Sequence, residues 1–471
     1  MATMIAPIRS LADLAGRRVV VLGMARSGLA AARMLAAAGA HVTAYDRRAA
    51  GELDASVHEL RDRGVTLALA AEPAEMRRLL TGAQLVVTSP SVSARFPTTD
   101  PWLREALAAA DTAGVQILGE VDLFLTLTHA RVLAVTGTKG KTTTTALIGA
   151  MLESAGVRHV VGGNIGRPLI EEVVDLTPED WAVLELSELQ LPTIPRGAEI
   201  AVYTNIGADH LDRHGSLEAY RAVKARLAEL SAERGIVLLN ADDPGCRELG
   251  ASLRGDLRWY GLEDRALAAT AADGTTYLGA SALLPVADVP LPGRHMLSNV
   301  LAAALASRLA GAAPIAIAEA IRRFPGVPHR LETVAERDGL RWVNDSQATI
   351  PHAAMAALEA FDAPVVLIAG GQGKGLDLAA FVELAVIRCR AVVLLGETAD
   401  ELERRIGGRV PVRRAQSMDD AVGLAGQLAM AGDVVILAPA ATSFDMFMDY
   451  AARGDAFRSA VQASLEAGGK A

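Results

Sequence analysis

Cysteine is scarce in this chain of 471 residues, where Cys246 and Cys389 are the only two. They lie far apart in the sequence, and neither belongs to a motif with the spacing of metal ligands. The sequence therefore supports neither a disulfide framework nor a zinc site. So few cysteines fit a reducing compartment, and we expect a cytoplasmic protein.

Long apolar runs and an excess of positive charge are also missing. No run approaches the roughly 18 apolar residues of a membrane span, and the stretch from Met1 to Arg18 lacks the apolar core of a signal peptide. The formal net charge of −9 argues against a general binder of nucleic acid or of membrane surfaces. We therefore predict no nucleic-acid partner and no membrane insertion, and an anionic ligand would need a local positive site.

Aromatic residues make up only 4% of the chain, whereas 51% of the residues are hydrophobic and 21% are charged. This aromatic-poor, alanine-rich balance suits helices packed on sheets rather than a β-sandwich, and it predicts a globular chain. Because domains usually contain about 100 to 200 residues, the length indicates about three of them.

Strand and helix patterns alternate along the whole chain, which is typical of α/β domains with mostly parallel sheets. A βαβ pattern opens the sequence, and a strand that ends near Gly119 closes the first domain. Proline and glycine cluster between Phe324 and Pro328 and mark a second boundary. We predict an N-terminal Rossmann-like domain (1–119), a central P-loop-type ATPase domain (120–327) and a C-terminal Rossmann-like domain (328–471). Short irregular strands between 251 and 289 predict an antiparallel addition to the central sheet.

The most informative segment is an apolar strand that runs directly into a turn and a helix, with the sequence Thr-Gly-Thr-Lys-Gly-Lys-Thr-Thr over residues 136–143. Glycines let the backbone turn sharply and aim several N–H groups at the place to which the positive end of the helix also points. We expect Lys141 to reach the β/γ-phosphates and the Thr142 hydroxyl to join the shell of a magnesium ion. The segment predicts a nucleoside triphosphate site, although Val135 stands where the standard P-loop has its first glycine.

A second turn, from Gly23 to Gly28, follows the first strand, and Asp46 ends the next one. The pattern resembles a dinucleotide fingerprint, but Ala25 replaces the glycine at which the backbone approaches a pyrophosphate. The turn could hold a UDP group or only build a tight connection between strand and helix. The residues alone leave both interpretations open.

Two further polar residues follow strands of the central region. Glu185 lies in Glu-Leu-Ser-Glu-Leu-Gln, and His210 lies in Thr-Asn-Ile-Gly-Ala-Asp-His-Leu-Asp. The carboxyl ends of parallel strands face the ligand crevice, so we expect both side chains near the glycine-rich turn, with Glu185 as a magnesium ligand. A lone Glu or His is more often a cap or an ion-pair partner, and Lys224 by itself is typical of a solvated helix lysine.

Together, the glycine-rich turn, the Glu185 and His210 motifs and the helix that carries Lys224 resemble the Mur ligases, cytoplasmic enzymes that build the peptidoglycan precursor. The runs Pro328-His329-Arg330, Trp342 to Ser346 and Ala438 to Asp445 are similar to those of members that add glutamate to UDP-N-acetylmuramoyl-L-alanine. The resemblance covers essentially the whole chain. It implies an ATP-dependent acid–amino-acid ligase that works through an acyl phosphate and releases ADP and phosphate, and we expect a monomer.

The resemblance also implies residue roles. ATP would contact Gly137, Thr138, Lys139, Gly140, Lys141, Thr142, Thr143, Asn299, Arg330 and Asp345. Magnesium ions would be held by Thr142, Glu185 and His210, together with Lys224 if that lysine carries the family's carbamate. The catalytic residues would be Lys141, His210 and Lys224.

The substrates would be divided between the first and third domains. The UDP part would contact Arg26, Ser27, Asp46 and Arg47, which disfavours NAD, and Asn164 would touch the muramoyl portion. The carboxylates of glutamate would be bound by Thr349, Lys374, Ser443, Phe444 and Tyr450. We also expect Ser443 to cap the final helix.

The chain departs from the family pattern at two charged positions. Gln347 replaces the usual lysine of Asn-Asp-Ser-Lys-Ala-Thr, and Lys139 replaces a common Asn or Ser. The lost charge beside ATP and glutamate leaves the amino-acid specificity open. We expect Gln347→Lys to change glutamate affinity by less than tenfold, or about 1.4 kcal/mol.

Other classes of protein remain as alternatives. A related Mur ligase could add a different amino acid or L-glutamate, and a folylpolyglutamate-synthase-like ligase is disfavoured by the N-terminal βαβ domain. A non-catalytic nucleotide-binding protein is disfavoured because Lys141, Thr142, Glu185, His210 and Lys224 occur together. An NAD oxidoreductase would require the weaker first turn to outweigh the second.

Overall fold

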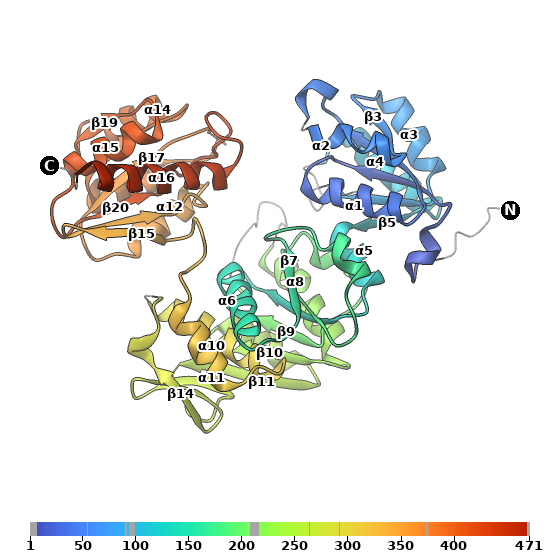
Figure 1. Cartoon of the computed structure of the whole chain (residues 1–471), viewed down its shortest axis with the longest axis horizontal. Coiled ribbons are helices and arrows are strands. Elements are labelled where there is room, and N and C mark those ends of the chain that lie inside the picture. Colours follow the sequence, from blue (N-terminus) through green and yellow to red (C-terminus); the bar gives the residue numbers. More distant parts are fainter. Residues whose placement is uncertain are drawn as a thin grey trace. The chain divides into compact units, whose positions relative to one another are not determined.

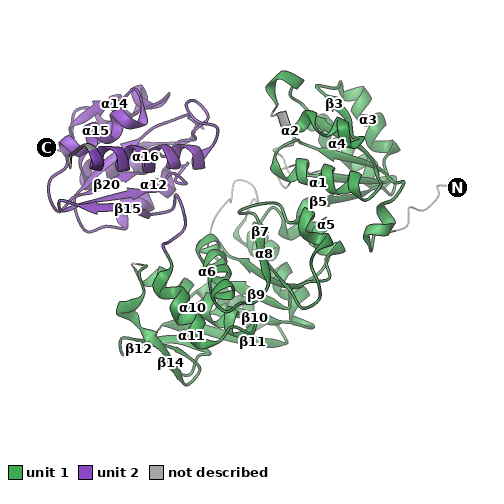
Figure 2. Ribbon diagram, in the orientation of Figure 1, with its two compact units in different colours: residues 1–324 green, residues 325–471 purple. Residues whose placement is uncertain are grey.

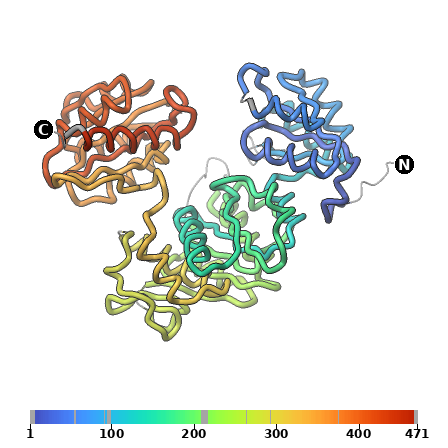
Figure 3. Tube along the Cα trace, viewed as in Figure 1, coloured from blue at the N-terminus to red at the C-terminus, as the bar shows by residue number. Residues whose placement is uncertain are grey.

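The computed structural model describes residues 7–53, 55–89, 92–93, 99–207, 216–262, 264–291, 293–373 and 375–468. The chain divides into two compact units, residues 1–324 and 325–471 (Figure 2). Unit 1 contains two sheets, formed in turn by the blue-to-cyan and the green-to-yellow parts of the chain (Figure 3). Unit 2 contains a third sheet. The predicted α/β class with mostly parallel sheets is confirmed.

The N-terminal sheet of unit 1 has five parallel strands in the order β3-β2-β1-β4-β5. Its edge strands β3 and β5 are labelled in Figure 1. Val19 to Leu22 are buried, as expected for a strand covered on both faces. The strands are β1 (Arg18–Leu22), β2 (His41–Asp46), β3 (Thr66–Leu69), β4 (Leu85–Thr88) and β5 (Gln116–Gly119). The helices are α1 (Arg26–Ala37), α2 (Ala55–His58), α3 (Pro73–Gly82) and α4 (Pro101–Thr112).

The central sheet has nine strands in the order β14-β13-β12-β11-β10-β9-β6-β8-β7. Its strands are β6 (Arg131–Thr136), β7 (His159–Gly163), β8 (Trp181–Glu185), β9 (Ile200–Tyr203), β10 (Ile236–Asn240), β11 (Asp256–Leu262), β12 (Ala269–Ala272), β13 (Thr275–Leu278) and β14 (Ser281–Pro285). The last three strands form antiparallel pairs, which confirms the predicted antiparallel addition. Because β6 lies between β8 and β9, the turn that follows it is flanked by the ends of both neighbours.

Helices surround the central sheet. They are α5 (Glu120–Leu127), α6 (Lys141–Ser154), α8 (Leu217–Ala232), α9 (Pro244–Ser252), α10 (Arg294–Leu309) and α11 (Pro314–Arg323). Helix α6 packs against α10 and α11. None of the helices in the described ranges is long and apolar enough to cross a bilayer.

Unit 2 is built on a six-stranded sheet in the order β15-β16-β20-β17-β18-β19, in which only the β15–β16 pair is antiparallel. The strands are β15 (Glu332–Arg337), β16 (Leu340–Asn344), β17 (Val365–Ala369), β18 (Cys389–Leu394), β19 (Val412–Arg414) and β20 (Val434–Leu437). The helices are α12 (Pro351–Glu359), α13 (Ala379–Arg388), α14 (Ala399–Ile406), α15 (Met418–Leu428) and α16 (Tyr450–Gly468). Helices α15 and α16 share one apolar cluster with Trp342, and α12, α13 and α14 share another.

One expectation differs from the structure. Helix α16 begins at Tyr450, so Ser443 does not cap it: the Ser443 carbonyl instead accepts hydrogen bonds from Met446 N and Phe447 N within a preceding turn. The division of the chain falls between Phe324 and Pro325, inside the predicted proline and glycine cluster. Residues 1–119 do not form a separate compact unit, because one apolar core continues from Val19 into α5 and the central sheet. The boundaries at 119/120 and 327/328 remain predictions.

Candidate active site

The glycine-rich turn joins the centre of the nine-stranded sheet to helix α6. Gly140 precedes the helix in the left-handed region with φ of +84°, and Gly137 adopts φ of +148°. A Cβ atom on Gly137 would lie 1.9 Å from Thr204 Oγ1 and 3.1 Å from the carbonyl oxygen of Asn205. Only glycine lets the turn approach the end of β9 this closely.

The segment after β9 holds the turn in shape. Thr138 N donates to the Asn205 carbonyl at 2.9 Å, and Lys139 N donates to Asn205 Oδ1 at 2.9 Å. Thr204 Oγ1 donates in return to the Lys139 carbonyl at 2.5 Å. The first N–H groups of a helix have no acceptor within the helix, so the start of α6 can meet an anion such as a phosphate.

Two lysines meet beneath this turn. Lys141 Nζ donates to the carbonyls of Gly137 and Thr138, each at 2.9 Å. Lys224 Nζ on α8 donates to the Gly137 carbonyl at 2.9 Å and to Thr136 Oγ1 at 3.3 Å. Lys224 is fully buried, with its ammonium 5.5 Å from the centre of the Tyr220 ring, so it is not the solvated lysine that its sequence context alone suggests.

Glu185 ends β8 directly beside the strand that leads into the turn, paired in register with Val135. Asn164 Nδ2 donates to Glu185 Oε1 at 2.7 Å, and Asn164 N donates to the Glu185 carbonyl at 2.8 Å. Gly163 permits this contact, since a Cβ there would lie 2.4 Å from the same carbonyl. The structure thus brings together two residues that the sequence assigned to different ligands.

The second carboxylate oxygen of Glu185 suits a cation. Glu185 is buried, and no donor among the described residues reaches Oε2. Carboxylate and hydroxyl oxygens are hard ligands of the kind that magnesium prefers, and Thr142 is buried at the start of α6. The described ranges do not by themselves gather three His, Cys, Asp or Glu side chains, and His210 lies outside them.

Asn299, predicted to contact ATP, lies against the same turn. It is buried on α10, and a Cβ atom on Gly140 would lie 2.5 Å from Asn299 Oδ1. Arg330 and Asp345, also predicted to contact ATP, belong to unit 2.

The candidate UDP site lies at the carboxyl ends of β1 and β2. Asp46 is buried and accepts a hydrogen bond from Met24 N at 2.9 Å. Burial raises the pKa of Asp46, but hydrogen bonds from the Arg48 side chain and from the backbone N–H groups of Met24 and Arg48 outweigh it and hold the pKa below its usual value. Arg26 and Ser27 open helix α1 nearby.

Arg48 was missed by sequence reasoning, which chose Arg47. Arg48 Nε and Nη2 donate to the two oxygens of Asp46, each at 3.0 Å, and both arginines are exposed. The two arginines are adjacent, and the alternation of side chains past the end of β2 was the available signal. Gly28 has a packing role: a Cβ there would lie 1.7 Å from the Gly23 carbonyl oxygen, so glycine is required where α1 meets the first turn.

In unit 2, Asp345 follows β16 and is buried, and its Oδ1 accepts a hydrogen bond from Leu331 N at 3.0 Å. Burial raises the pKa of Asp345 to about 6. Arg330 Nε donates to Gln347 Oε1 at 3.2 Å. The glutamine that replaces the family's lysine therefore serves as an acceptor for a predicted ATP-binding arginine.

The residues predicted to bind the substrate glutamate belong to three segments of unit 2 that hydrogen bonds connect. Ser346 Oγ, three residues before Thr349, donates to the Tyr450 carbonyl at 2.7 Å. Thr442, which precedes Ser443, exchanges backbone hydrogen bonds with Gln372 at 2.9 and 3.0 Å. Ser443 is buried, Phe444 is 65% exposed and Tyr450 is 37% exposed. Lys374, two residues after Gln372, lies outside the described residues.

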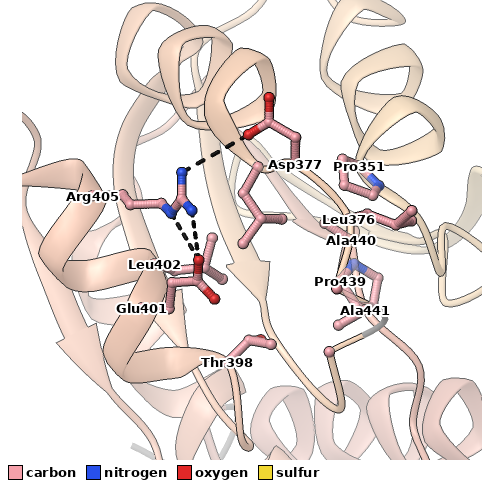
Figure 4. A pocket seen from close by; sticks show the side chains of 13 residues that line it. Pro351, Leu376, Asp377, Thr398, Glu401, Leu402, Arg405, Pro439, Ala440 and Ala441 are labelled. Atoms are coloured by element: carbon pink, nitrogen blue, oxygen red, sulfur yellow. Dashed lines mark hydrogen bonds and ion pairs between the residues drawn. The ribbon is translucent and has the colours of Figure 1, made fainter.

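A cavity of about 380 Å³ opens at this edge of the unit 2 sheet (Figure 4). Its walls come from the segment after β17, from Pro439 to Ala441 and from α14, where Arg405 pairs with Glu401 at 2.7 Å. Gly373 and Gly375, on either side of Lys374, also line it. None of the described residues that we predict to bind glutamate lines this cavity. The cavity therefore lies next to those residues and is not formed by them.

Known proteins resemble the chain over most of its length. Residues 135–307 match the family described as Mur ligase middle domain, and residues 329–441 match Mur ligase, glutamate ligase domain. The UDP-N-acetylmuramoylalanine–D-glutamate ligase of Acidobacterium capsulatum is 40% identical over 465 residues, covering 96% of this chain and 97% of the relative. The enzyme of the same name from Frankia casuarinae is 42% identical over 460 residues, covering 95% of this chain and 94% of the relative.

A solved structure supports the fold. The UDP-N-acetylmuramate–alanine ligase of Thermotoga maritima superposes with a TM-score of 0.58 at 18% identity, covering 95% of this chain and all of that one. The two domain matches, and the identity to these relatives over nearly the full length, show the family as well as the fold. The chain therefore belongs to the Mur ligase family and is a ligase.

Proposed function

We propose that this chain is a UDP-N-acetylmuramoylalanine–D-glutamate ligase, which joins the amino group of D-glutamate to the carboxylate of UDP-N-acetylmuramoyl-L-alanine and converts ATP to ADP and phosphate. The observation that supports it most is Lys141 and buried Glu185 beside one glycine-rich turn, in a chain 40% identical to such ligases over nearly its full length. The reaction belongs to peptidoglycan precursor synthesis in the cytoplasm, and we expect a monomer to perform it.

The first chemical step joins two anions. An oxygen of the substrate carboxylate attacks the γ-phosphorus of ATP, the bond from that phosphorus to the β–γ bridging oxygen breaks, and ADP leaves. Repulsion between the carboxylate and the triphosphate opposes this approach. Lys141 offsets that repulsion when its ammonium moves from the Gly137 and Thr138 carbonyls to the phosphates.

The second step forms the amide. The neutral amine of glutamate attacks the carbonyl carbon of the acyl phosphate, the amine loses a proton, and the carbon–oxygen bond to phosphate breaks. Holding the amine next to this carbon turns a bimolecular encounter into an intramolecular one. We assign that task to Thr349, Lys374, Ser443, Phe444 and Tyr450 of unit 2.

The UDP-bearing substrate is held by unit 1. We assign its UDP part to Arg26, Ser27, Asp46 and Arg47 and add Arg48, because Arg48 contacts Asp46. Asn164 touches the muramoyl portion and also holds Glu185. Binding of this substrate and the position of the metal-binding carboxylate are therefore coupled through one side chain.

We assign magnesium to Thr142, Glu185 and His210, together with Lys224 if that lysine carries a carbamate, and ATP to Gly137–Thr143, Asn299, Arg330 and Asp345. Bound magnesium supplies charge that stabilises the transferring phosphoryl group. The buried, unpartnered oxygen of Glu185 supports its place in this set. The catalytic roles fall to Lys141, His210 and Lys224.

An amino-acid panel tests the proposal. The full chain is incubated with UDP-N-acetylmuramoyl-L-alanine, ATP and magnesium, and phosphate release is followed with each amino acid in turn. We expect D-glutamate to give the highest kcat/KM, with L-glutamate and neutral amino acids at least about tenfold lower. Preference for another amino acid would identify a related Mur ligase, and no phosphate release with any amino acid would contradict ligase activity on this acceptor.

A further inference from the structure

Arg453, near the start of α16, is a large charged side chain that is almost completely buried, with 1% of its surface exposed. Nothing in the sequence singled it out. Its guanidinium makes four hydrogen bonds: Nε donates to Ser346 Oγ at 3.0 Å, Nη2 to the Ser346 carbonyl at 2.9 Å, and Nη1 to the carbonyls of Ala441 and Thr442 at 3.1 and 3.0 Å. Every one of these acceptors is neutral.

These acceptors belong to two segments that carry residues predicted to bind the substrate glutamate. Ser346 lies three residues before Thr349, and Thr442 immediately precedes Ser443. Ser346 Oγ also donates to the Tyr450 carbonyl, and Thr442 exchanges hydrogen bonds with Gln372, two residues before Lys374. One guanidinium therefore joins the β16–α12 and β20–α16 connections directly and the segment after β17 indirectly.

The fit around the guanidinium is tight. A Cβ atom on Gly371 would lie 2.1 Å from the Thr442 carbonyl oxygen and 3.1 Å from Arg453 Nη1. The glycine thus lets the segment after β17 pack against both the arginine and its acceptor. A change of about 1 Å in the position of the Ser346 or the Ala441–Thr442 segment would break hydrogen bonds at Arg453, because these interactions weaken steeply with distance and angle.

The charge of Arg453 is costly where it lies. Burial lowers its pKa to about 10, opposed by the carboxylate of Asp445. Asp445 accepts a hydrogen bond from Glu397 N, and no described carboxylate forms an ion pair with Arg453. Taking a guanidinium out of water costs free energy, and here only hydrogen bonds to neutral acceptors offset that cost.

We propose that Arg453 is the positioning residue for the amino-acid substrate, fixing the spacing of the Ser346–Thr349 and Ala441–Ser443 segments between which the substrate carboxylates bind. This inference rests on the proposed function. Arg453 has no exposed surface with which to contact the substrate, so it acts through these segments. Lysine cannot replace it, because an ammonium lacks the planar fork that reaches acceptors on two segments at once.

The test uses the full chain and measures KM for D-glutamate, ATP and UDP-N-acetylmuramoyl-L-alanine separately. We expect Arg453→Lys to raise KM for glutamate at least about tenfold while the other two KM values change less than about twofold. Arg390→Lys is the control, because Arg390 is a unit 2 arginine that makes two hydrogen bonds to Asp433 at the opposite, amino end of the sheet. The control variant should keep all three KM values.

A second variant covers the case in which Arg453→Lys does not fold. Ser346→Ala removes one acceptor of Arg453 and the link to Tyr450 without removing charge. We expect a selective rise of KM for glutamate of about threefold or more. Guanidinium ion should lower the KM for glutamate of an Arg453→Ala variant towards the wild-type value and should not affect the wild type.

The outcomes separate the inference from the proposed function. If the wild type turns over glutamate but all three KM values rise together in Arg453→Lys, or none changes, Arg453 has a general structural role and the inference is wrong. Where neither Arg453 variant folds, unchanged glutamate KM in Ser346→Ala overturns it. If the wild type itself does not use glutamate, the proposed function fails first.

Discussion

Lys141 and Lys224 donate hydrogen bonds to the same acceptor: each Nζ lies 2.9 Å from the carbonyl oxygen of Gly137. One lysine opens α6, and the other reaches the turn from the buried face of α8. The shared carbonyl offsets part of the repulsion between the two ammonium groups. A carbamate on Lys224 would reverse its charge and leave one N–H on Nζ, so a hydrogen bond to the Gly137 carbonyl would lose the contribution of the positive charge.

This relationship makes the chemical state of Lys224 testable. We expect Lys224→Ala to lower kcat by about a hundredfold or more, because a buried charge beside the phosphate turn is lost. If the working form is a carbamate, formate or acetate should restore activity, and peptide mass spectrometry under carbon dioxide should detect the modification. Restoration by small amines and not by acids would show that the ammonium is the working form.

The second prediction concerns the close approach of Gly137 to Thr204. Gly137→Ala would place a methyl group 1.9 Å from Thr204 Oγ1, so the turn must move away from the end of β9. We expect ATP affinity, measured by calorimetry without the other substrates, to fall at least about tenfold. Gly279→Ala is the control, because Gly279 also has positive φ but meets no atom within 4 Å. It should cost about 1 kcal/mol of stability and leave ATP affinity unchanged.

Asn164 should affect the metal site as well as the sugar substrate. Asn164→Ala frees Glu185 Oε1 from its 2.7 Å hydrogen bond, and the carboxylate loses its fixed orientation. We predict that half-saturating magnesium rises about tenfold, and that manganese binding measured by electron paramagnetic resonance without turnover weakens by a similar factor. A change confined to KM for UDP-N-acetylmuramoyl-L-alanine would contradict this link.

Protonation of Asp345 should lower kcat/KM for ATP at acid pH. Burial raises its pKa to about 6, so the carboxylate is protonated in acid and ionised at neutral pH. If the ionised form accepts hydrogen bonds from ATP, kcat/KM for ATP should rise as pH increases through about 6. Asp345→Asn should lower kcat/KM and remove this dependence on pH. If the variant shows the same decrease of kcat/KM at acid pH, another group causes that decrease.

The same carboxyl has the opposite effect on stability. Because its folded pKa is raised, its contribution to stability is fully present below the ordinary value of 3.8 and is lost as pH rises through about 6. Thermal unfolding should show Asp345→Asn gaining stability relative to the wild type as pH rises from about 4 to about 7. A constant difference between the two proteins across that range would contradict the raised pKa.

Restoring the family's lysine at position 347 should have only a small effect on glutamate affinity. Gln347→Lys restores the family's charge but removes the acceptor that Arg330 Nε meets at 3.2 Å. We expect glutamate affinity to change by less than tenfold, or about 1.4 kcal/mol, in steady-state kinetics. A much larger loss would show that the chain compensates for the lost lysine elsewhere.

The sequence predicted those features that local patterns encode. The strand, the glycines and the following helix of the 136–143 turn are adjacent in the chain, and Glu185 lies where an apolar strand ends. Asn164 and Glu185 are each recognisable alone, but their contact depends on the pairing of β7 with β8, and β7 was not predicted. Strand β3 was also missed, because its four residues give too short a pattern to distinguish from a loop.

The burial of charged side chains was what the sequence patterns mainly failed to predict. Lys224 and Arg453 both lie on helices whose sequences are typical of partly exposed surfaces, yet each is almost completely buried. Their acceptors are carbonyl and hydroxyl groups of distant segments, and no spacing in the chain indicates such contacts. The false cap at Ser443 has a related cause, because the turn that precedes α16 is stabilised by contacts with the segment after β17.

The measurement that tests the central claim most directly follows labelled oxygen through one reaction. UDP-N-acetylmuramoyl-L-alanine with isotopically labelled carboxylate oxygen is incubated with ATP, magnesium and D-glutamate, and all products are weighed by mass spectrometry. We predict a UDP product that has gained one glutamate residue, together with ADP and phosphate that carries one labelled oxygen. A glutamyl product with unlabelled phosphate would contradict the acyl phosphate, and ADP without a glutamyl product would contradict the ligase.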